Sequence, residues 1–510
     1  MAGRTPTTEH GGARAPRSHA RCILFALVAA SFVAHLGARA DAQEPTPSKL
    51  PVGGESAMPP ESLPGILRVE GGWTADTVGA RAQKTSFDVA AKQASLRAAQ
   101  ARVATAVVAF FPRLSGLASY TRYQDLAQPS LGTLVEPTTP GLMGSIPPTT
   151  ALSAVPLSFT IPLNYWVFQA TLTVPLSDYV LRLTQQHAAA SRSAEAARAD
   201  ALASKAKACS DAKIAFYQYV KAVAQRDVLV QAKSVAAAHL VDAENLFQVG
   251  RASHADVLAT EANVAAAQLA IDQATEMVGI SEEQLRLATH APPSEPVSIG
   301  EDVTSALPLS TSDLRALKQE AAANRPEIRS LSLGALAQDQ LASSARAAQW
   351  PSVSAVGDYS YANPSPRIFL PEADFHGFWD AGVRVTWAIN DVFSGDAAGA
   401  EQQAGAVNLR AQSAQLRDAI LAEVTQAVLA RRTADSSIES STAQLRSAEA
   451  AYRDRRDLFR LGKGTSVELA DAEADLFRAR LAAISARIDQ RIASVRIDHA
   501  TGRDVGGGAS

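Results

Sequence analysis

Two carboxylates near the C-terminal end of the chain, Glu468 and Asp471, are the groups best placed for a chemical role. They are three residues apart, so a helix would carry both on one face. Carboxylates gathered around a common axis attract cations and repel one another. For a single chain the simpler interpretation is a pair of solvated carboxylates. Whether they instead gather around an axis depends on how the helices that carry them are arranged.

No other arrangement of side chains in the sequence indicates catalysis or metal binding. The histidines beyond residue 35 are scattered, and none has further ligands at metal-site spacing. The sequence has no Walker loop, no nucleophile elbow and no glycine-rich dinucleotide turn, and its serines lack an accompanying base. His254 and Asp256 are interpreted as residues of a helix's first turn and not as an acid–base pair. We therefore predict no enzymatic activity, no cofactor and no metal site.

The composition favours long helices and argues against several protein classes. Of 510 residues, 47% are hydrophobic and only 19% are charged, which excludes a disordered polyelectrolyte. The formal net charge of −3 provides no basic field, so no nucleic-acid partner is expected. Alanine is abundant and aromatic residues make up only 6%, a bias typical of long, closely packed helices. A compact α/β enzyme is disfavoured.

Residues 1–42 have the features of a secretory signal peptide. Arginines precede an apolar stretch from Cys22 to Leu36, and small-residue cleavage sites follow it. An uncleaved anchor is the alternative, although the stretch is short for a membrane span. Beyond this leader no stretch of about 18 apolar residues occurs, so any later membrane crossing has to be made by β-strands. Cys209 would be the only thiol of the mature chain, which excludes an internal disulfide.

Prolines divide the chain into two halves that repeat one another. Linkers are predicted at 43–73 and 291–311 and a flexible tail at 503–510, which leaves repeats at 74–290 and 312–502. The segments 176–291 and 372–510 contain no proline and predict long helices. The sequence LFQVG at 246–250 falls on LFRLG at 458–462, and this register continues without a gap through the following helix.

Each repeat is predicted to run helix, strand, loop, strand, very long helix, glycine turn, helix. Apolar and polar residues alternate from Phe168 to Leu176 and from Ala381 to Ile389, and further strands are predicted after Pro112 and Pro351. Strands of about nine residues with one apolar face suit a sheet between lipid and water. A soluble, half-buried hairpin is the alternative. Four strands cannot close a membrane barrel, because the smallest use about eight, so the chain has to contribute them to an oligomer.

The long helices are predicted to form a tube. From Asp178 to Gly250, and from Asp391 to Gly462, each would extend about 110 Å at about 1.5 Å per residue. Such alanine-rich helices carry too little apolar bulk to stand alone, and their small residues favour close packing among several helices.

In this order, the features resemble the TolC-like outer membrane efflux protein family from about Thr74 to Gly502. The resemblance rests on short sequence motifs, each of which is weak alone. Together they are specific, and the strand starts and the turns occur in both repeats. They are Asn324–Ile328 (NRPEI) opening the first helix of the second repeat, the strand starts at Pro112 and Pro351, and the glycine turns at Gly250 and Gly462.

The resemblance implies a fold that is mainly α with membrane β. Three chains would each contribute four strands to a 12-stranded outer-membrane β-barrel, continued by a long periplasmic α-helical barrel. The implied function is the exit duct of a tripartite efflux pump or a type I secretion system in a Gram-negative bacterium. Export through it would be passive, with a periplasmic adaptor and an inner-membrane pump of the RND, MFS or ABC type as partners.

The resemblance also assigns roles to the residues around the glycine turns, which would be the periplasmic tips. The residues expected to contact the adaptor are Val249, Gly250, Arg251, Leu461, Gly462 and Lys463. Solvated turn charges are the alternative for Arg251 and Lys463. Glycine suits these turns because it adopts the left-handed conformation and exposes backbone to a partner.

At the pore entrance, the resemblance places Glu468 and Asp471 in an acidic ring and Asp256 in a gate network. The chain departs from the family pattern at Phe459 and Gly464, where some members have a tyrosine and an arginine that lock neighbouring hairpins. Phe459 cannot donate a hydrogen bond and Gly464 carries no charge. The closed gate is therefore expected to be held differently or less tightly.

A periplasmic coiled-coil adaptor or structural protein without a pore is the main alternative. An adaptor would have one helical hairpin flanked by β-rich segments. This chain is predicted to have two hairpins, each preceded by a pair of strands.

Overall fold

A computed structural model describes residues 69–125, 132–138, 151–156, 162–303, 307–308, 313–369 and 372–505. The predicted signal peptide at 1–42, most of the linker at 43–73 and residues 506–510 of the tail lie outside these ranges. The chain divides into two units, Met1–Pro60 and Glu61–Ser510, and every described residue belongs to the second.

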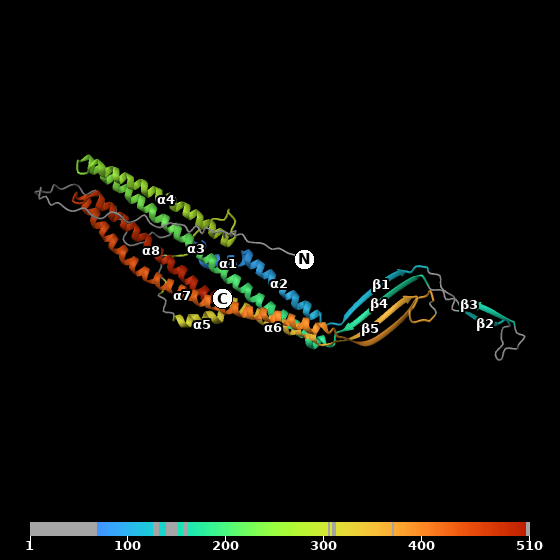
Figure 1. Ribbon diagram of the computed structural model, residues 1–510. Coiled ribbons are helices and arrows are strands. Elements are labelled where there is room, and N and C mark those ends of the chain that lie inside the picture. Colours follow the sequence, from blue (N-terminus) through green and yellow to red (C-terminus); the bar gives the residue numbers. More distant parts are fainter. Residues whose placement is uncertain are drawn as a thin grey trace, which may run out of the picture. The chain divides into compact units, whose positions relative to one another are not determined.

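Each half of the second unit contains two short helices, strands of one sheet and a long helical hairpin (Figure 1). The first half consists of α1 (Ala75–Thr85), α2 (Phe87–Val108), β1 (Arg113–Arg122), β2 (Thr133–Pro137), β3 (Leu152–Pro156), β4 (Asn164–Val174), the π-helix η1 (Tyr179–Leu183), α3 (Thr184–Gln248) and α4 (His254–Thr289). The second half consists of α5 (Leu314–Asn324), α6 (Pro326–Arg346), the short 3₁₀ helix η2 (Ala347–Gln349), β5 (Ser352–Asn363), β6 (His376–Thr386), α7 (Asn390–Arg460), α8 (Ser466–Thr501) and the 3₁₀ turn η3 (Arg503–Val505).

The structure differs from the sequence prediction in three places. The first helix of each repeat is broken in two, because Ser86 and Arg325 adopt extended backbone. Arg325 precedes Pro326, whose ring disfavours the α conformation in the residue before it, so the Asn324–Ile328 motif opens the second helix of its repeat and not the first. The segment expected to be a loop contains the hairpin β2–β3. Finally, two strands are displaced from their predicted bounds: β4 runs from Asn164 to Val174 and not from Phe168 to Leu176, and β6 runs from His376 to Thr386 and not from Ala381 to Ile389.

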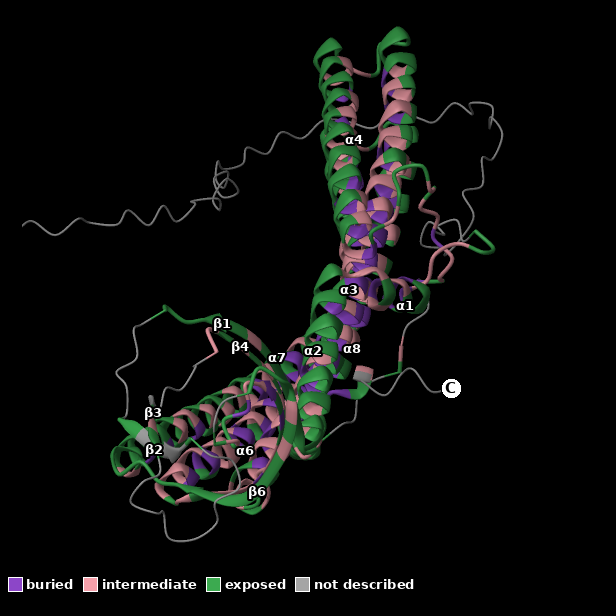
Figure 2. Ribbon diagram, turned by 90° about the vertical axis from the view of Figure 1, so that its right-hand side faces the viewer, coloured by how far each residue is buried: buried purple, intermediate pink, exposed green. Residues whose placement is uncertain are grey.

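Two long hairpins make up most of the helical part. α3 has 65 residues and α7 has 71, which correspond to about 98 Å and about 107 Å of helix. Each is followed after a glycine turn by a 36-residue helix, α4 or α8. Figure 1 shows α3 beside α4 and α7 beside α8. Figure 2 shows buried residues concentrated on the faces where helices meet.

The main core lies where α1, α3, α4 and α8 meet the segment after α4. Phe216 and Val220 of α3, Leu285 of α4 and Ile488 of α8 are fully enclosed there. Many of the remaining contacts are made by alanines, which let the helix backbones approach closely. Burial on these contact faces therefore stabilises the helices, since their own propensity is not sufficient.

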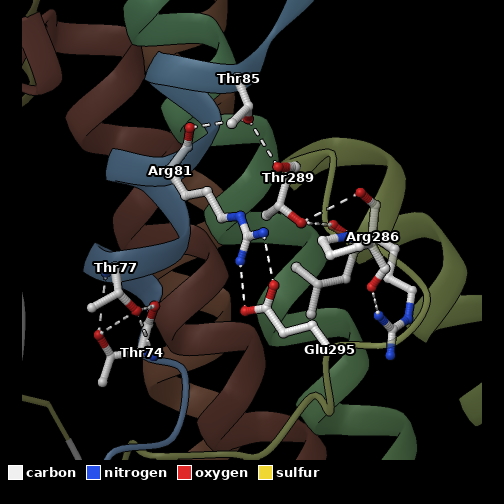
Figure 3. Close-up of polar contacts among 9 residues, drawn as sticks. Thr74, Thr77, Arg81, Thr85, Arg286, Thr289 and Glu295 are labelled. Carbon is white, nitrogen blue, oxygen red and sulfur yellow. Dashed lines mark hydrogen bonds and ion pairs between the residues drawn. The ribbon is translucent and has the colours of Figure 1, made fainter.

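Polar contacts fasten α1 to the end of α4 (Figure 3). The Arg81 guanidinium donates hydrogen bonds of 2.7 and 2.8 Å to the two oxygens of Glu295, and the Thr85 hydroxyl donates to the Thr289 carbonyl at 2.8 Å. The arginine holds the pKa of the Glu295 carboxyl below its usual range. The guanidinium also lies 5.3 Å from the ring centroid of Trp73. These contacts fix α1 against the predicted linker.

The sheet is antiparallel, in the order β1-β4-β5-β6. Phe168 of β4 lies between Ala118 of β1 and Tyr361 of β5, and Tyr359 lies opposite Trp379 of β6. Residues paired across strands share a face, so this register decides which side chains line each side of the sheet. None of the helices in the described ranges is both long and apolar enough to cross a membrane.

Candidate functional site

One face of the sheet is apolar along all four strands. Large side chains on it are exposed, among them Trp379 at 75% and Val383 at 69%. The residues of this face are Leu114, Gly116, Ala118 and Tyr120; Trp166, Phe168, Ala170, Leu172 and Val174; Val353, Ala355, Gly357, Tyr359 and Tyr361; and Gly377, Trp379, Ala381, Val383 and Val385. We call this surface the apolar sheet face. A water-soluble domain rarely exposes so continuous an apolar surface, so the face requires an apolar partner.

The opposite face is mostly polar, as the alternation in the sequence predicts. There Asp358 of β5 accepts hydrogen bonds from Gln169 at 2.9 Å and from the Thr171 hydroxyl of β4. This face also carries some apolar side chains, among them Leu117, Val167 and Phe378. Val356 is buried on it beside Thr173 and Gly382. The sheet therefore separates an apolar side from a polar one.

Aromatic rings gather at the end of the apolar sheet face that is farther from the long helices. The rings of Tyr120 and Trp166 lie 4.4 Å apart, and Tyr361 stacks on Phe375 at 5.1 Å. Amphipathic rings of this kind are enriched where membrane proteins meet the lipid headgroups.

Both hairpins turn at a glycine in the left-handed conformation, with φ of +73° at Gly250 and +71° at Gly462. In the first turn the Arg251 N–H donates to the Leu246 carbonyl at 2.8 Å, and in the second the matching bond is 2.9 Å. This is the Schellman pattern, in which glycine ends a helix and the turn satisfies its last carbonyls. The glycine turns predicted from the sequence are confirmed.

All six residues predicted to contact an adaptor are exposed at these tips. The Arg251 side chain reaches toward the second turn, where its Nη1 lies 4.0 Å from the position that a Cβ on Gly462 would take. The tips of the two hairpins are therefore neighbours.

The acidic residues just after each turn cap the helices that follow. Asp256 accepts hydrogen bonds from the Ser253 N–H at 2.9 Å and hydroxyl at 2.7 Å, which lower the pKa of its carboxyl. Glu468 accepts from the Thr465 N–H at 3.3 Å in the same arrangement. Because the pKa of Asp256 is lowered in the fold, its stabilisation of α4 is present at neutral pH and is lost as the pH falls through that lowered value.

The structure places Glu468 and Asp471 together on the wall of a groove between α7 and α8, with a volume of 980 Å³. Glu468 also forms an ion pair of 3.3 Å with Arg455 of α7. Asp471 is exposed and makes no hydrogen bond or ion pair with the described part of the chain. The two carboxylates therefore share a surface, but only Glu468 has a structural role within the chain.

Phe459, predicted to belong to the gate, is a buried residue. It is 4% exposed and packs with Tyr452, Leu469 and Leu476 between α7 and α8. Its ring also meets His239 of α3, and this histidine contacts Ser466 and Glu473 of α8. Nothing in the sequence around His239 indicates this contact, because its partners lie more than 200 residues further along the chain.

No group of histidine, cysteine and carboxylate side chains suited to a metal ion is found among the described residues. The geometry that carries functional information is therefore the apolar sheet face at one end of the hairpins and the tips at the other.

Residues 78–290 and 317–503 match the family described as outer membrane efflux protein.

The chain belongs to the outer membrane efflux protein family. Solved structures of outer-membrane channels share its fold. The channel OprN is 20% identical, with a TM-score of 0.67, over 88% of this chain and 98% of its own. CmeC of Campylobacter jejuni is 16% identical, with a TM-score of 0.64, over 84% of this chain and 85% of its own. VceC of Vibrio cholerae is 15% identical, with a TM-score of 0.64, over 84% of this chain and 96% of its own. No curated protein matches the chain.

The family and the fold class predicted from the sequence are confirmed. The chain is a mainly α-helical tandem repeat with a small sheet, as in these outer-membrane channels. The family consists of channels and not of enzymes. Its members reside in the outer membrane, which agrees with the apolar sheet face.

The tip glycines give a prediction about the stability of this efflux protein. Gly462→Ala is expected to lower the free energy of unfolding by about 1 kcal/mol, because a Cβ is disfavoured in the left-handed conformation. Gly279→Ala is the matched control, since Gly279 lies inside α4 with open space where its Cβ would be. That change should stabilise the protein by about 0.5–1 kcal/mol. Urea unfolding midpoints measure both, and shifts of the same sign would contradict the assignment of the turn.

Proposed function

We propose that the chain is one protomer of an outer-membrane exit duct, through which an efflux pump or type I secretion system passes its cargo passively. The observation that carries the proposal is the exposed apolar sheet face, joined directly to hairpins about 100 Å long. The sheet suits a lipid bilayer on one side and an aqueous passage on the other. The hairpins are long enough to reach far into a periplasm.

The sheet edges support a closed oligomer of this chain, and membership of the family indicates three copies. Among the strands that the structure describes, β1 and β6 each pair on one side only. Unpaired edges favour pairing with another chain. If β6 of one copy pairs with β1 of the next, three copies supply 12 strands, which is enough for a closed membrane barrel. The long hairpins would then continue the barrel as a ring of helices.

The tips are the proposed contact with a periplasmic adaptor, which links the duct to an inner-membrane RND, MFS or ABC pump. Val249 and Leu461 are exposed apolar side chains beside the turn glycines, and Arg251 and Lys463 add charge. Exposed apolar groups next to accessible backbone suit a helical partner.

At the entrance we propose that Glu468 and Asp471 line an acidic ring around the trimer axis. Glu468→Gln with Asp471→Asn is expected to raise the concentration of a trivalent cation that half-blocks the channel by about tenfold or more, because the negative charge is removed. Glutamine retains the helix cap, so the fold is preserved. Block is measured in a planar bilayer with the cation on the side of the tips.

The control for the ring is Glu283→Gln, an exposed carboxylate near the other end of α4. It should leave the block unchanged. An unchanged block in the double variant would remove the acidic ring while leaving the duct intact.

Membrane fractionation tests the exit duct against the alternative of a soluble periplasmic adaptor. The expressed protein should sediment with the outer membrane and migrate as a trimer that persists in detergent until it is heated. Release with the periplasmic fraction as a soluble protein would favour the adaptor.

A further inference from the structure

A buried polar cluster joins the two hairpins near their tips. His239 of α3 is 4% exposed, and Ser466 and Glu473 of α8 are 6% and 7% exposed. The imidazole Nδ1 lies 3.5 Å from Glu473 Oε2, and Nε2 lies 3.4 Å from Ser466 Oγ. The ring also meets Phe459 of α7 edge-on, with the ring centroids 5.0 Å apart and the planes at 85°. One side chain of the first hairpin thus contacts both helices of the second.

The repeat does not explain this burial. Glu261 corresponds to Glu473 in the first half and is exposed. Burying an ionisable pair costs more free energy than burying apolar side chains at the same place. Its presence between alanine-rich helices therefore points to a role other than holding the helices together. A Ser–His–Glu arrangement also resembles that of a hydrolase, but all three side chains are buried between helices, out of reach of a substrate.

The strength of the cluster depends on the protonation state of the histidine. The neutral imidazole can accept at Nε2 from the Ser466 hydroxyl, while its Nδ1 lies 3.5 Å from the Glu473 carboxylate. The protonated ring donates from both nitrogens and is a cation beside a buried carboxylate. The attraction between opposite charges at this distance is present only in the protonated form, so a proton on His239 tightens the contact between the hairpins.

Other charges around the cluster are engaged elsewhere. On α7, Arg456 lies 6.0 Å from the ring centroid of Tyr452, and Arg460 pairs at 3.7 Å with Asp242 of α3. Burial, followed by the charge of Glu473, raises the pKa of the Tyr452 phenol, so the field of that carboxylate extends to α7.

On α8, Arg480 pairs at 4.0 Å with Glu449 of α7. The N-terminus of α8, where Ser466 is the first helical residue, opposes a positive charge on His239. Glu473 is therefore the group of the cluster that favours the protonated ring.

We propose that His239, Glu473 and Ser466 form a proton-sensitive latch that holds the two hairpins together near their tips and loosens as the pH rises. This proposal depends on the proposed exit duct, because separation of the hairpins widens a passage only if the chain forms a duct. It supplies a polar contact between the hairpins at a place where Phe459 can donate no hydrogen bond.

The test is the conductance of the full-length protein in a planar bilayer at pH 5.5 and pH 8.0. We expect the wild-type protein to conduct at least about threefold more at pH 8.0 than at pH 5.5. His239→Gln, which keeps a donor and an acceptor but takes up no proton, should bring the ratio close to one. Glu473→Gln should do the same.

Two matched controls separate the latch from general effects of pH. Glu261→Gln changes the exposed counterpart of Glu473, and His254→Gln changes an exposed histidine at the first tip. Both should keep the wild-type ratio. If either cluster variant fails to assemble, Ser466→Ala removes only a hydroxyl and should still lower the ratio.

An unchanged ratio in His239→Gln, or a wild-type conductance equal at both pH values, would overturn the latch while leaving the duct. A folded, membrane-inserted wild-type protein without conductance at either pH would overturn the exit duct instead.

Discussion

Val383→Arg is expected to reduce the amount of protein in the outer membrane at least about tenfold. Val383 is 69% exposed on the apolar sheet face, between the aromatic end and the start of α7. An arginine facing lipid there makes the free energy of membrane insertion less favourable by up to about 2–4 kcal/mol in each chain, and a trimer contains three such arginines. The measurement is quantitative blotting of membrane fractions, together with heat-modifiable migration of the trimer.

The matched control is Gly382→Arg, one residue earlier and on the opposite face. A Cβ at Gly382 meets nothing within 4 Å, and the polar Arg384 lies on the same side of β6. Successive residues of a strand point to opposite faces, so the two variants place an arginine on opposite sides of the same strand. Equal loss of both variants from the membrane would contradict the assignment of the faces.

Arg431→Ala is expected to lower the free energy of unfolding by about 3–5 kcal/mol, because removing one partner of a buried ion pair leaves polar groups without compensation. Arg431 of α7 is 7% exposed. Its guanidinium donates to Asp435 at 2.9 Å, to the Pro308 carbonyl at 2.6 Å and to the Ser494 hydroxyl of α8. One side chain therefore joins α7, α8 and the segment that links the two repeats.

Arg432→Ala is the control for this prediction, since Arg432 is the exposed neighbour on the same helix. Its effect should stay within about 0.5 kcal/mol, as is usual for surface positions. Urea unfolding of both variants measures the difference. Similar midpoints would show that the buried network does not stabilise the junction between the repeats.

Patterns that repeat along the chain predicted most of the fold. The absence of proline from 176–291 and 372–510 predicted the two hairpins, and the alternation from Phe168 and from Ala381 predicted two strands and their apolar faces. The break at Ser86 was missed, because the helical composition continues across it. Pro326 correctly indicated a helix start, but the preceding helix α5 was missed, so α6 was predicted as the first helix of its repeat. A single extended residue is enough to redirect the chain at both places.

The site was less accessible from the sequence. The turn glycines could be predicted, since a left-handed residue at a helix end has a residue preference of its own. The burial of Phe459 and His239 could not, because it depends on how one hairpin packs on the other. Glu468 shows a related difficulty, since one carboxylate both caps α8 and lines the groove, and its type and spacing fit either role.

Single-channel recording of the purified protein in a planar bilayer tests the exit duct most directly. We expect discrete, stepwise conductance from the inserted trimer without any pump, nucleotide or cofactor, because the duct is passive. A folded protein that inserts into the bilayer and conducts no ions would contradict the proposal and favour a structural role.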